Sequence, residues 1–64
     1  MTPAEIKQLR LAANQTQTQA AELIGSTLSG WQKWESGVYS MHAGLIELYQ
    51  LKTGQHPEYT LVKK

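Results

Sequence analysis

Residues 16–37 read TQTQAAELIGSTLSGWQKWESG, and this stretch decides the fold of the chain. Thr16 is followed three residues later by Gln19, a pattern that starts a helix with a reciprocal cap. Gly25 can adopt the left-handed backbone that ends a helix and opens a sharp turn. Thr27 follows that turn and can cap a second helix by accepting a hydrogen bond from one of its free amides. The stretch therefore predicts two short helices joined by a tight turn.

The apolar residues of this stretch fit two helices that cross closely. The buried side of the first helix is expected to consist of Ala20, Ala21, Leu23 and Ile24. Ala21 is small where the two helices must approach each other. Trp31 and Trp34 are large and three residues apart, so both face the core from a helix that we expect over residues 28–35. Residues 17–35 thus have the layout of a helix-turn-helix.

Two further helices are expected around this unit. Residues 2–5, TPAE, combine a capping threonine, a proline suited to the first turn and a capping-box glutamate, and the helix that they start should end near Asn14. Residues 38–41 are most simply a loop, and a last helix covers about residues 42–52. The apolar residues of that last helix are Leu45, Ile46, Leu48, Tyr49 and Leu51. These are more apolar residues than one narrow helix face can hold, which indicates either a wide stripe buried in the core or a second contact surface.

The end of the chain does not continue this helical pattern. Residues 55–57, QHP, oppose a helix, and residues 59–62 alternate large apolar with β-branched side chains, which is typical of a short strand or an extended tail. A lone strand is not stable, so it must lie on its own domain or pair with a twin from another subunit. We therefore divide the chain into one domain, 1–54, and a tail, 55–64. The candidate dimer contacts on the tail are Tyr59, Leu61 and Val62.

Composition narrows the class of protein. The chain has 64 residues, a net charge of +1 and no cysteine, which predicts one small domain without disulfides, and pairing with a second copy as a source of stability. It has no aspartate, five scattered glutamates and two histidines without a nucleophile–base or metal-ligand spacing. We therefore expect no enzyme, metal, cofactor or small-molecule substrate. Neither a secretory signal nor a membrane span is visible, so a cytoplasmic protein is expected.

The chain resembles the Cro/repressor helix-turn-helix family, also called the xenobiotic-response-element (XRE) type, which is common among phage and prophage regulators and antitoxins. The residues that match at the spacing of the family are Gln17, Ala21, Gly25, Thr27, Trp34 and Glu35. The resemblance implies an all-α, lambda-repressor-like bundle of four to five short helices with an extended or short β tail. It also implies an ion pair between Arg10 and Glu35, which would tie the first helix to the third.

This chain departs from the family at three points. Ser26 stands where the family usually buries an aliphatic side chain, and Gly30 lies inside the third helix at a cost of roughly 1 kcal/mol in helix preference. Trp31 is larger than usual and is expected to fill the space that these small residues leave. The third helix also carries a single lysine and no arginine, which weakens the expectation of strong guanine reading.

If the third helix enters the major groove of double-stranded DNA, the tryptophans point inward and the opposite side meets the bases. The candidate base-reading residues are Thr27, Leu28, Ser29, Gln32 and Lys33. The Gln32 amide can form paired hydrogen bonds with adenine, and Lys33 can donate to guanine acceptors or to a phosphate. Leu28 or the Thr27 methyl group can contact a thymine methyl. The candidate phosphate contacts are Gln17, Thr18, Tyr39 and Ser40.

The function expected from the resemblance is a dimeric repressor that reads a near-palindromic operator, with residues 1–54 as its DNA-binding domain. The alternative is an antitoxin or adaptor whose tail or last helix binds another protein, with DNA binding secondary or absent. The low net charge and the single lysine of the third helix favour this alternative modestly.

Overall fold

The structure of this protein is a computed structural model, and it describes residues 1–59. Within those residues the chain forms helices and no strand. The helices are α1 (Pro3–Ala12), α2 (Gln17–Leu23), α3 (Leu28–Ser36) and α4 (Ala43–Lys52). The predicted all-α class is therefore confirmed. The predicted tail strand falls mainly on residues 60–62, so Leu61 and Val62 lie outside the described residues, as the last residues of the chain do.

α1, α2 and α3 begin at the caps that the sequence predicts, whereas α4 is capped by His42, whose Nδ1 accepts from the Gly44 amide. Thr2 Oγ1 accepts from the Glu5 amide at 3.2 Å, and Glu5 Oε1 accepts from the Thr2 amide at 2.9 Å, which completes a capping box. Thr16 and Gln19 form the same pair of bonds at 3.2 and 2.9 Å. Thr27 Oγ1 accepts from the amide three residues further on, at 3.1 Å. Each cap satisfies donors that a helix start leaves free.

The turn between α2 and α3 depends on Gly25. Its φ of 70° lies in the left-handed region, where a side chain would be strained. The amide of Ser26 then donates to the carbonyl of Ala21 at 2.8 Å, which closes the end of α2. Gly37 ends α3 in the same way, with a φ of 82°. These two glycines set both ends of the segment that contains α3.

Trp31 is the centre of the core. It is fully buried, and its ring lies 5.0 Å from that of Tyr49 and 5.6 Å from that of Trp34, measured between ring centroids. The other buried side chains around it are Ile6, Ala20, Ala21, Ile24 and Met41. Trp34 is half-buried and packs against this cluster, so both tryptophans face inward as predicted. Met41 lies in the predicted loop, yet its side chain is part of the core.

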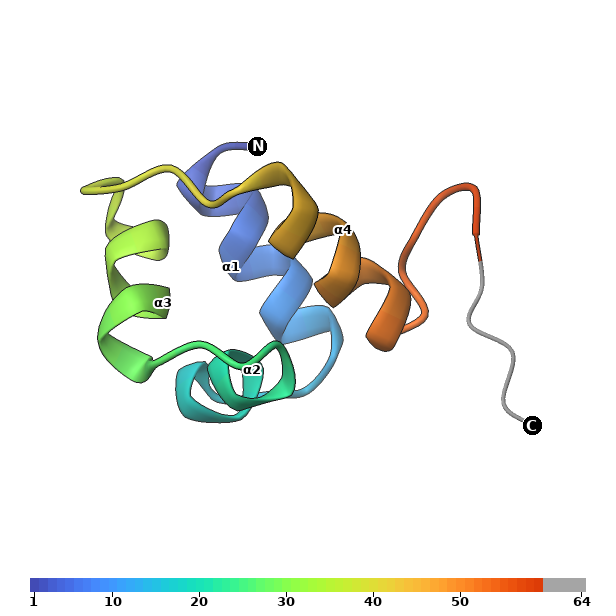
Figure 1. The fold of residues 1–64 in the computed structure, drawn as a ribbon, viewed down its shortest axis with the longest axis horizontal. Coiled ribbons are helices and arrows are strands. Elements are labelled where there is room, and N and C mark those ends of the chain that lie inside the picture. Colours follow the sequence, from blue (N-terminus) through green and yellow to red (C-terminus); the bar gives the residue numbers. More distant parts are fainter. Residues whose placement is uncertain (60–64) are drawn as a thin grey trace.

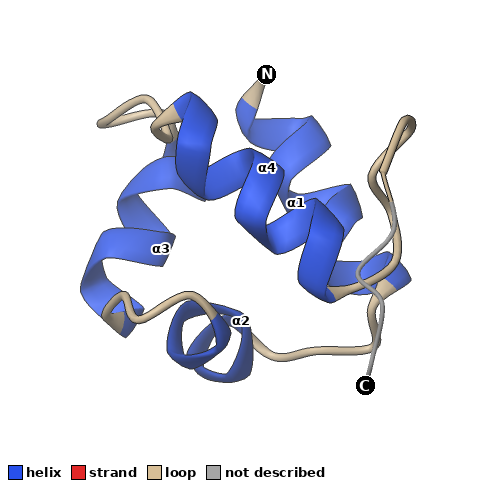
Figure 2. Ribbon diagram, turned by 45° about the vertical axis from the view of Figure 1, so that its right-hand side comes forward, coloured by secondary structure: helices blue, strands red, loops and turns tan. Residues whose placement is uncertain are grey.

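α3 lies at one end of the long axis of the molecule (Figure 1). It packs against α1 and α2, and the segment that follows α4 lies at the opposite end in both Figure 1 and Figure 2. α4 has one fully buried residue, Tyr49, while Leu45, Ile46, Leu48 and Leu51 are half-buried. None of the helices in residues 1–59 is long and apolar enough to cross a bilayer.

Candidate nucleic-acid interface

The two sides of α3 have different environments. Its inner face carries Trp31, Trp34 and Glu35, which are buried or half-buried against α1 and α2. The residues opposite are all exposed, and we call them the outer face of α3: Thr27, Leu28, Ser29, Gln32 and Lys33. α3 itself lies at the left of the molecule in Figure 1, with the other helices to its right. Within the described residues the outer face is therefore exposed to solvent.

An ion pair fixes α3 to α1. Arg10 Nε donates to Glu35 Oε2 at 2.7 Å, and Arg10 Nη2 donates to Glu35 Oε1 at 3.1 Å, so the contact is bidentate. The two side chains are 12% and 7% exposed. Trp31 Nε1 also donates to Glu35 Oε2, and Arg10 Nη1 donates to the carbonyl of Gln15 at 3.1 Å. The inner face of α3 thus has its polar groups satisfied, as buried polar groups require.

The electrostatics of this pair follow from its contacts. Burial raises the pKa of Glu35, but the hydrogen bonds from Arg10 and Trp31 and the charge of Arg10 outweigh burial, so the pKa lies below its ordinary value. The hydrogen bond to Glu35 raises the pKa of Arg10. Arg10 and Glu35 are therefore both charged at neutral pH. Burial also raises the pKa of the neighbouring Tyr49, whose hydroxyl donates to Gln15 Oε1 at 2.8 Å.

Gln17 connects the ion pair to the outer face of α3. Its Nε2 donates to Glu35 Oε1 at 3.4 Å, and its Oε1 accepts from Gln32 Nε2 at 3.5 Å. The sequence predicts Gln17 as a phosphate contact, and in the free protein its amide is already engaged by these two long hydrogen bonds. Thr18, the neighbouring candidate, is exposed at the start of α2. The start of α2 and the middle of α3 therefore lie side by side.

Lys33 lies towards the loop that follows α3. Its Nζ is 5.4 Å from the centroid of the Tyr39 ring, a cation–π contact. Its carbonyl accepts from the amides of Val38 and Tyr39 at 3.0 and 3.3 Å, which folds the loop back onto the end of the helix. Tyr39 and Ser40 are exposed. Of the two predicted phosphate contacts in the loop, Tyr39 therefore lies beside the lysine of α3.

The two small residues near the start of α3 have a steric role. A Cβ on Gly30 would lie 3.3 Å from both Ser26 Oγ and Thr27 Oγ1. The missing side chain at position 30 thus leaves room for the hydroxyl that caps α3. Trp31 is buried in the core, whereas the atoms that border the missing side chain of Gly30 are these two hydroxyl oxygens.

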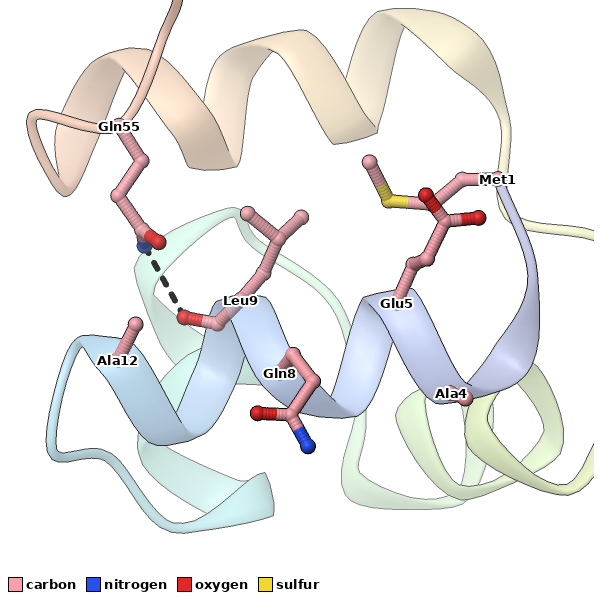
Figure 3. A pocket seen from close by; sticks show the side chains of 7 residues that line it. All are labelled: Met1, Ala4, Glu5, Gln8, Leu9, Ala12 and Gln55. Atoms are coloured by element: carbon pink, nitrogen blue, oxygen red, sulfur yellow. Dashed lines mark hydrogen bonds between the residues drawn. The ribbon is translucent and has the colours of Figure 1, made fainter.

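A second surface was not predicted from the sequence. A groove of 470 Å³ runs along α1, and Gln55 covers one end of it by donating from Nε2 to the carbonyl of Leu9 at 3.0 Å (Figure 3). The other lining residues are Met1, Ala4, Glu5, Gln8 and Ala12. Ala4, Gln8 and Ala12 are four residues apart, so they share one helix face. That spacing is the signal that sequence reasoning missed.

No family model matches the chain. It is 38% identical over 52 residues to the Type II methyltransferase M.MspI of Moraxella sp.. The match covers 81% of this chain and 12% of the methyltransferase, so it concerns a small part of that protein. Within residues 1–59, no group of histidine, aspartate and glutamate residues could hold a metal ion.

Proposed function

We propose that this protein is a sequence-specific DNA-binding regulator of the Cro/repressor helix-turn-helix type, most simply a dimeric repressor. The observation that carries the proposal is that α3 has two different faces. Its inner face is buried and held to α1 by the Arg10–Glu35 pair, and its outer face is exposed. The caps, the glycine turn and the Arg10–Glu35 pair all support the helix-turn-helix interpretation of α2 and α3. In this proposal α3 lies in the major groove with its N-terminal residues at the base edges.

The outer face offers a mixed reading surface. Gln32 can pair with the N6 and N7 positions of adenine, and the Ser29 hydroxyl can either donate or accept. Lys33 is held near Tyr39, at the end of α3 away from its cap. We therefore favour a phosphate for Lys33, together with Tyr39 and Ser40, over a guanine. Phosphate contacts of this kind set the register of the helix in the groove.

We propose that Gln17 and Thr18 contact a second phosphate, next to the start of α2. Gln17 would then exchange a long hydrogen bond within the protein for one to the DNA backbone. Since Gln17 also contacts Gln32 at 3.5 Å, the phosphate contact and the base contact would form together. The low net charge of +1 implies that such hydrogen bonds carry much of the affinity.

We propose a homodimer that reads half-sites about one helical turn apart. α4 supports this because four of its aliphatic side chains keep part of their surface exposed within the described chain, and one of them, Leu51, lies outside the set that packs against the core. Tyr59, which is exposed in the segment that follows α4, belongs to the same proposal. Sedimentation velocity with and without operator DNA tests it. A monomer under both conditions would remove the dimer from the proposal and leave the reading surface untouched.

Gel-shift titrations against DNA from upstream of its own gene test DNA binding itself. We expect a complex that resists non-specific competitor DNA and weakens as salt is raised. A ligand selected from random duplexes serves as a second probe. Absence of a complex with both probes would contradict the proposed function.

The groove on α1 supports a second candidate function, an adaptor or antitoxin that binds another protein. The groove is apolar and lies on α1, whereas α3 carries the reading surface. Replacing Ala4 or Ala12 with glutamate would block the groove and leave the outer face of α3 intact. If the variant keeps both its DNA binding and its cellular phenotype, the regulator is supported. If it keeps DNA binding and loses the phenotype, the adaptor is favoured.

A further inference from the structure

Leu28 is the large apolar residue on the outer face of α3. It is the first residue of the helix, and 42% of its surface is exposed. Ser29 beside it and Gln32 one turn further along are exposed and polar. A single exposed leucine is common on protein surfaces, so exposure alone does not indicate a contact. The position of Leu28 does indicate one, because the first residues of a recognition helix reach the base edges.

Thr27 is the other candidate for an apolar contact at this end, and the structure separates the two residues. The Thr27 hydroxyl is held at 3.1 Å from the Gly30 amide, so this side chain is committed to the cap. Leu28 is outside the core cluster and has no such commitment. Long side chains on a helix lean towards its N-terminus, so Leu28 covers the leading end of α3. Leu28 is therefore the larger of the two apolar groups at this end of α3 and the one that leans over its start.

Resting on the proposed function, we propose that Leu28 reads the 5-methyl group of a pyrimidine in the major groove. Thymine presents this methyl group there, and cytosine does not. A cytosine methylated at the same ring carbon presents the same group, so the contact has two possible sources. Gln32 lies on the same side of α3, one turn away, and can read an adjacent adenine. The half-site should then contain a methyl-bearing pyrimidine within a base pair or two of an adenine.

The test uses a duplex selected from random sequence by the full chain. Each thymine is replaced in turn by deoxyuridine, which removes only the methyl group, and each cytosine in turn by 5-methylcytosine. Affinity is measured for the native protein, for Leu28→Ala and for Leu11→Ala. Leu11 is a matched control because it is 46% exposed and lies on α1. Burial of one methyl group corresponds to about three- to fivefold in affinity.

If thymine is the source, deoxyuridine at one position weakens native binding about three- to fivefold and leaves Leu28→Ala unchanged. If methylcytosine is the source, methylation at one position strengthens native binding by the same factor and again has no effect on Leu28→Ala. Leu11→Ala should respond as the native protein does. A duplex that binds and responds at no position, or a Leu28→Ala variant that keeps the response, overturns this inference alone. Failure to select any duplex overturns the proposed function as well.

Discussion

The inner and outer faces of α3 use their polar groups in opposite ways. On the inner face, Glu35 accepts hydrogen bonds from Arg10, Trp31 and Gln17, and Trp31 is fully buried. On the outer face, Ser29 and Lys33 are exposed, and the side chain of Lys33 contacts the ring of Tyr39 in the loop that follows, at 5.4 Å from its centroid. One face holds the helix in place, and the other is free to meet a partner. Changes to the inner face should therefore alter stability, and changes to the outer face should alter binding.

Trp31→Ala should have the largest effect. Removing a fully buried tryptophan costs about 3–5 kcal/mol, which is comparable to the whole stability of a small domain. We expect the variant to be largely unfolded at 25 °C by circular dichroism. The control is Tyr39→Ala, which removes an exposed aromatic residue and should change stability by less than about 0.5 kcal/mol. Equal effects of the two substitutions would contradict the burial of Trp31.

Arg10→Met comes next. It leaves the Glu35 carboxylate buried without its cation, which should cost about 3 kcal/mol of unfolding free energy. Lys7→Met is the matched control because Lys7 is an exposed cation on the same helix. Urea denaturation of both variants measures the difference. A loss no greater than that of Lys7→Met would show that the pair contributes little to holding α3 on α1.

The double variant Gln32→Ala, Lys33→Ala tests the outer face. We expect a loss of operator affinity of about 1–3 kcal/mol for Gln32, with a further loss for Lys33, and a thermal midpoint within a few degrees of the native one. Gln8→Ala, Lys7→Ala removes the same groups from α1 and serves as the control. Affinity that matches the control would remove Gln32 and Lys33 from the reading surface.

The pH dependence of stability should report on the inner face. The pKa of Glu35 is lower in the folded protein than in the unfolded chain, where it is about 4.3. Its contribution is therefore fully present above that value and is lost as pH falls through the folded pKa. We expect unfolding free energy to decline below about pH 4.5, and less steeply in Glu35→Gln.

In Glu35→Gln the unfolding free energy should still fall somewhat with falling pH, because the hydrogen bonds with Thr2 also lower the pKa of Glu5. Chemical denaturation from neutral pH down to about pH 3 provides the measurement. Identical slopes in the native protein and in Glu35→Gln would show that the ion pair does not control acid stability.

The sequence predicts most of this fold because its local signals agree with one another. The two capping boxes, the Gly25 turn and the tryptophan spacing each fix a helix start, a helix end or a face. The burial of Met41 could not be predicted, because a methionine within a loop has no periodic pattern around it. The buried face of α4 could not be predicted either, because its apolar residues surround the helix and leave no single face to assign.

For the candidate site, the exposure of the outer face followed from helical spacing alone. The Arg10–Glu35 contact came from the family resemblance, since 25 residues separate its members in the chain. The Gln17 bridge and the Lys33–Tyr39 contact could not be predicted, because they depend on how α2 and the loop after α3 are placed around that helix. The groove on α1 depends in the same way on where Gln55 folds back.

Amide chemical-shift mapping with operator DNA tests the central claim most directly. The native protein labelled with ¹⁵N would be titrated with the duplex used in the gel shifts. The proposal predicts that the largest changes cluster at Thr27, Leu28, Ser29, Gln32 and Lys33, with a second group at Gln17 and Thr18. Changes concentrated instead along Ala4, Gln8 and Ala12, with α3 unaffected, would contradict the assignment of the outer face as the DNA-reading surface.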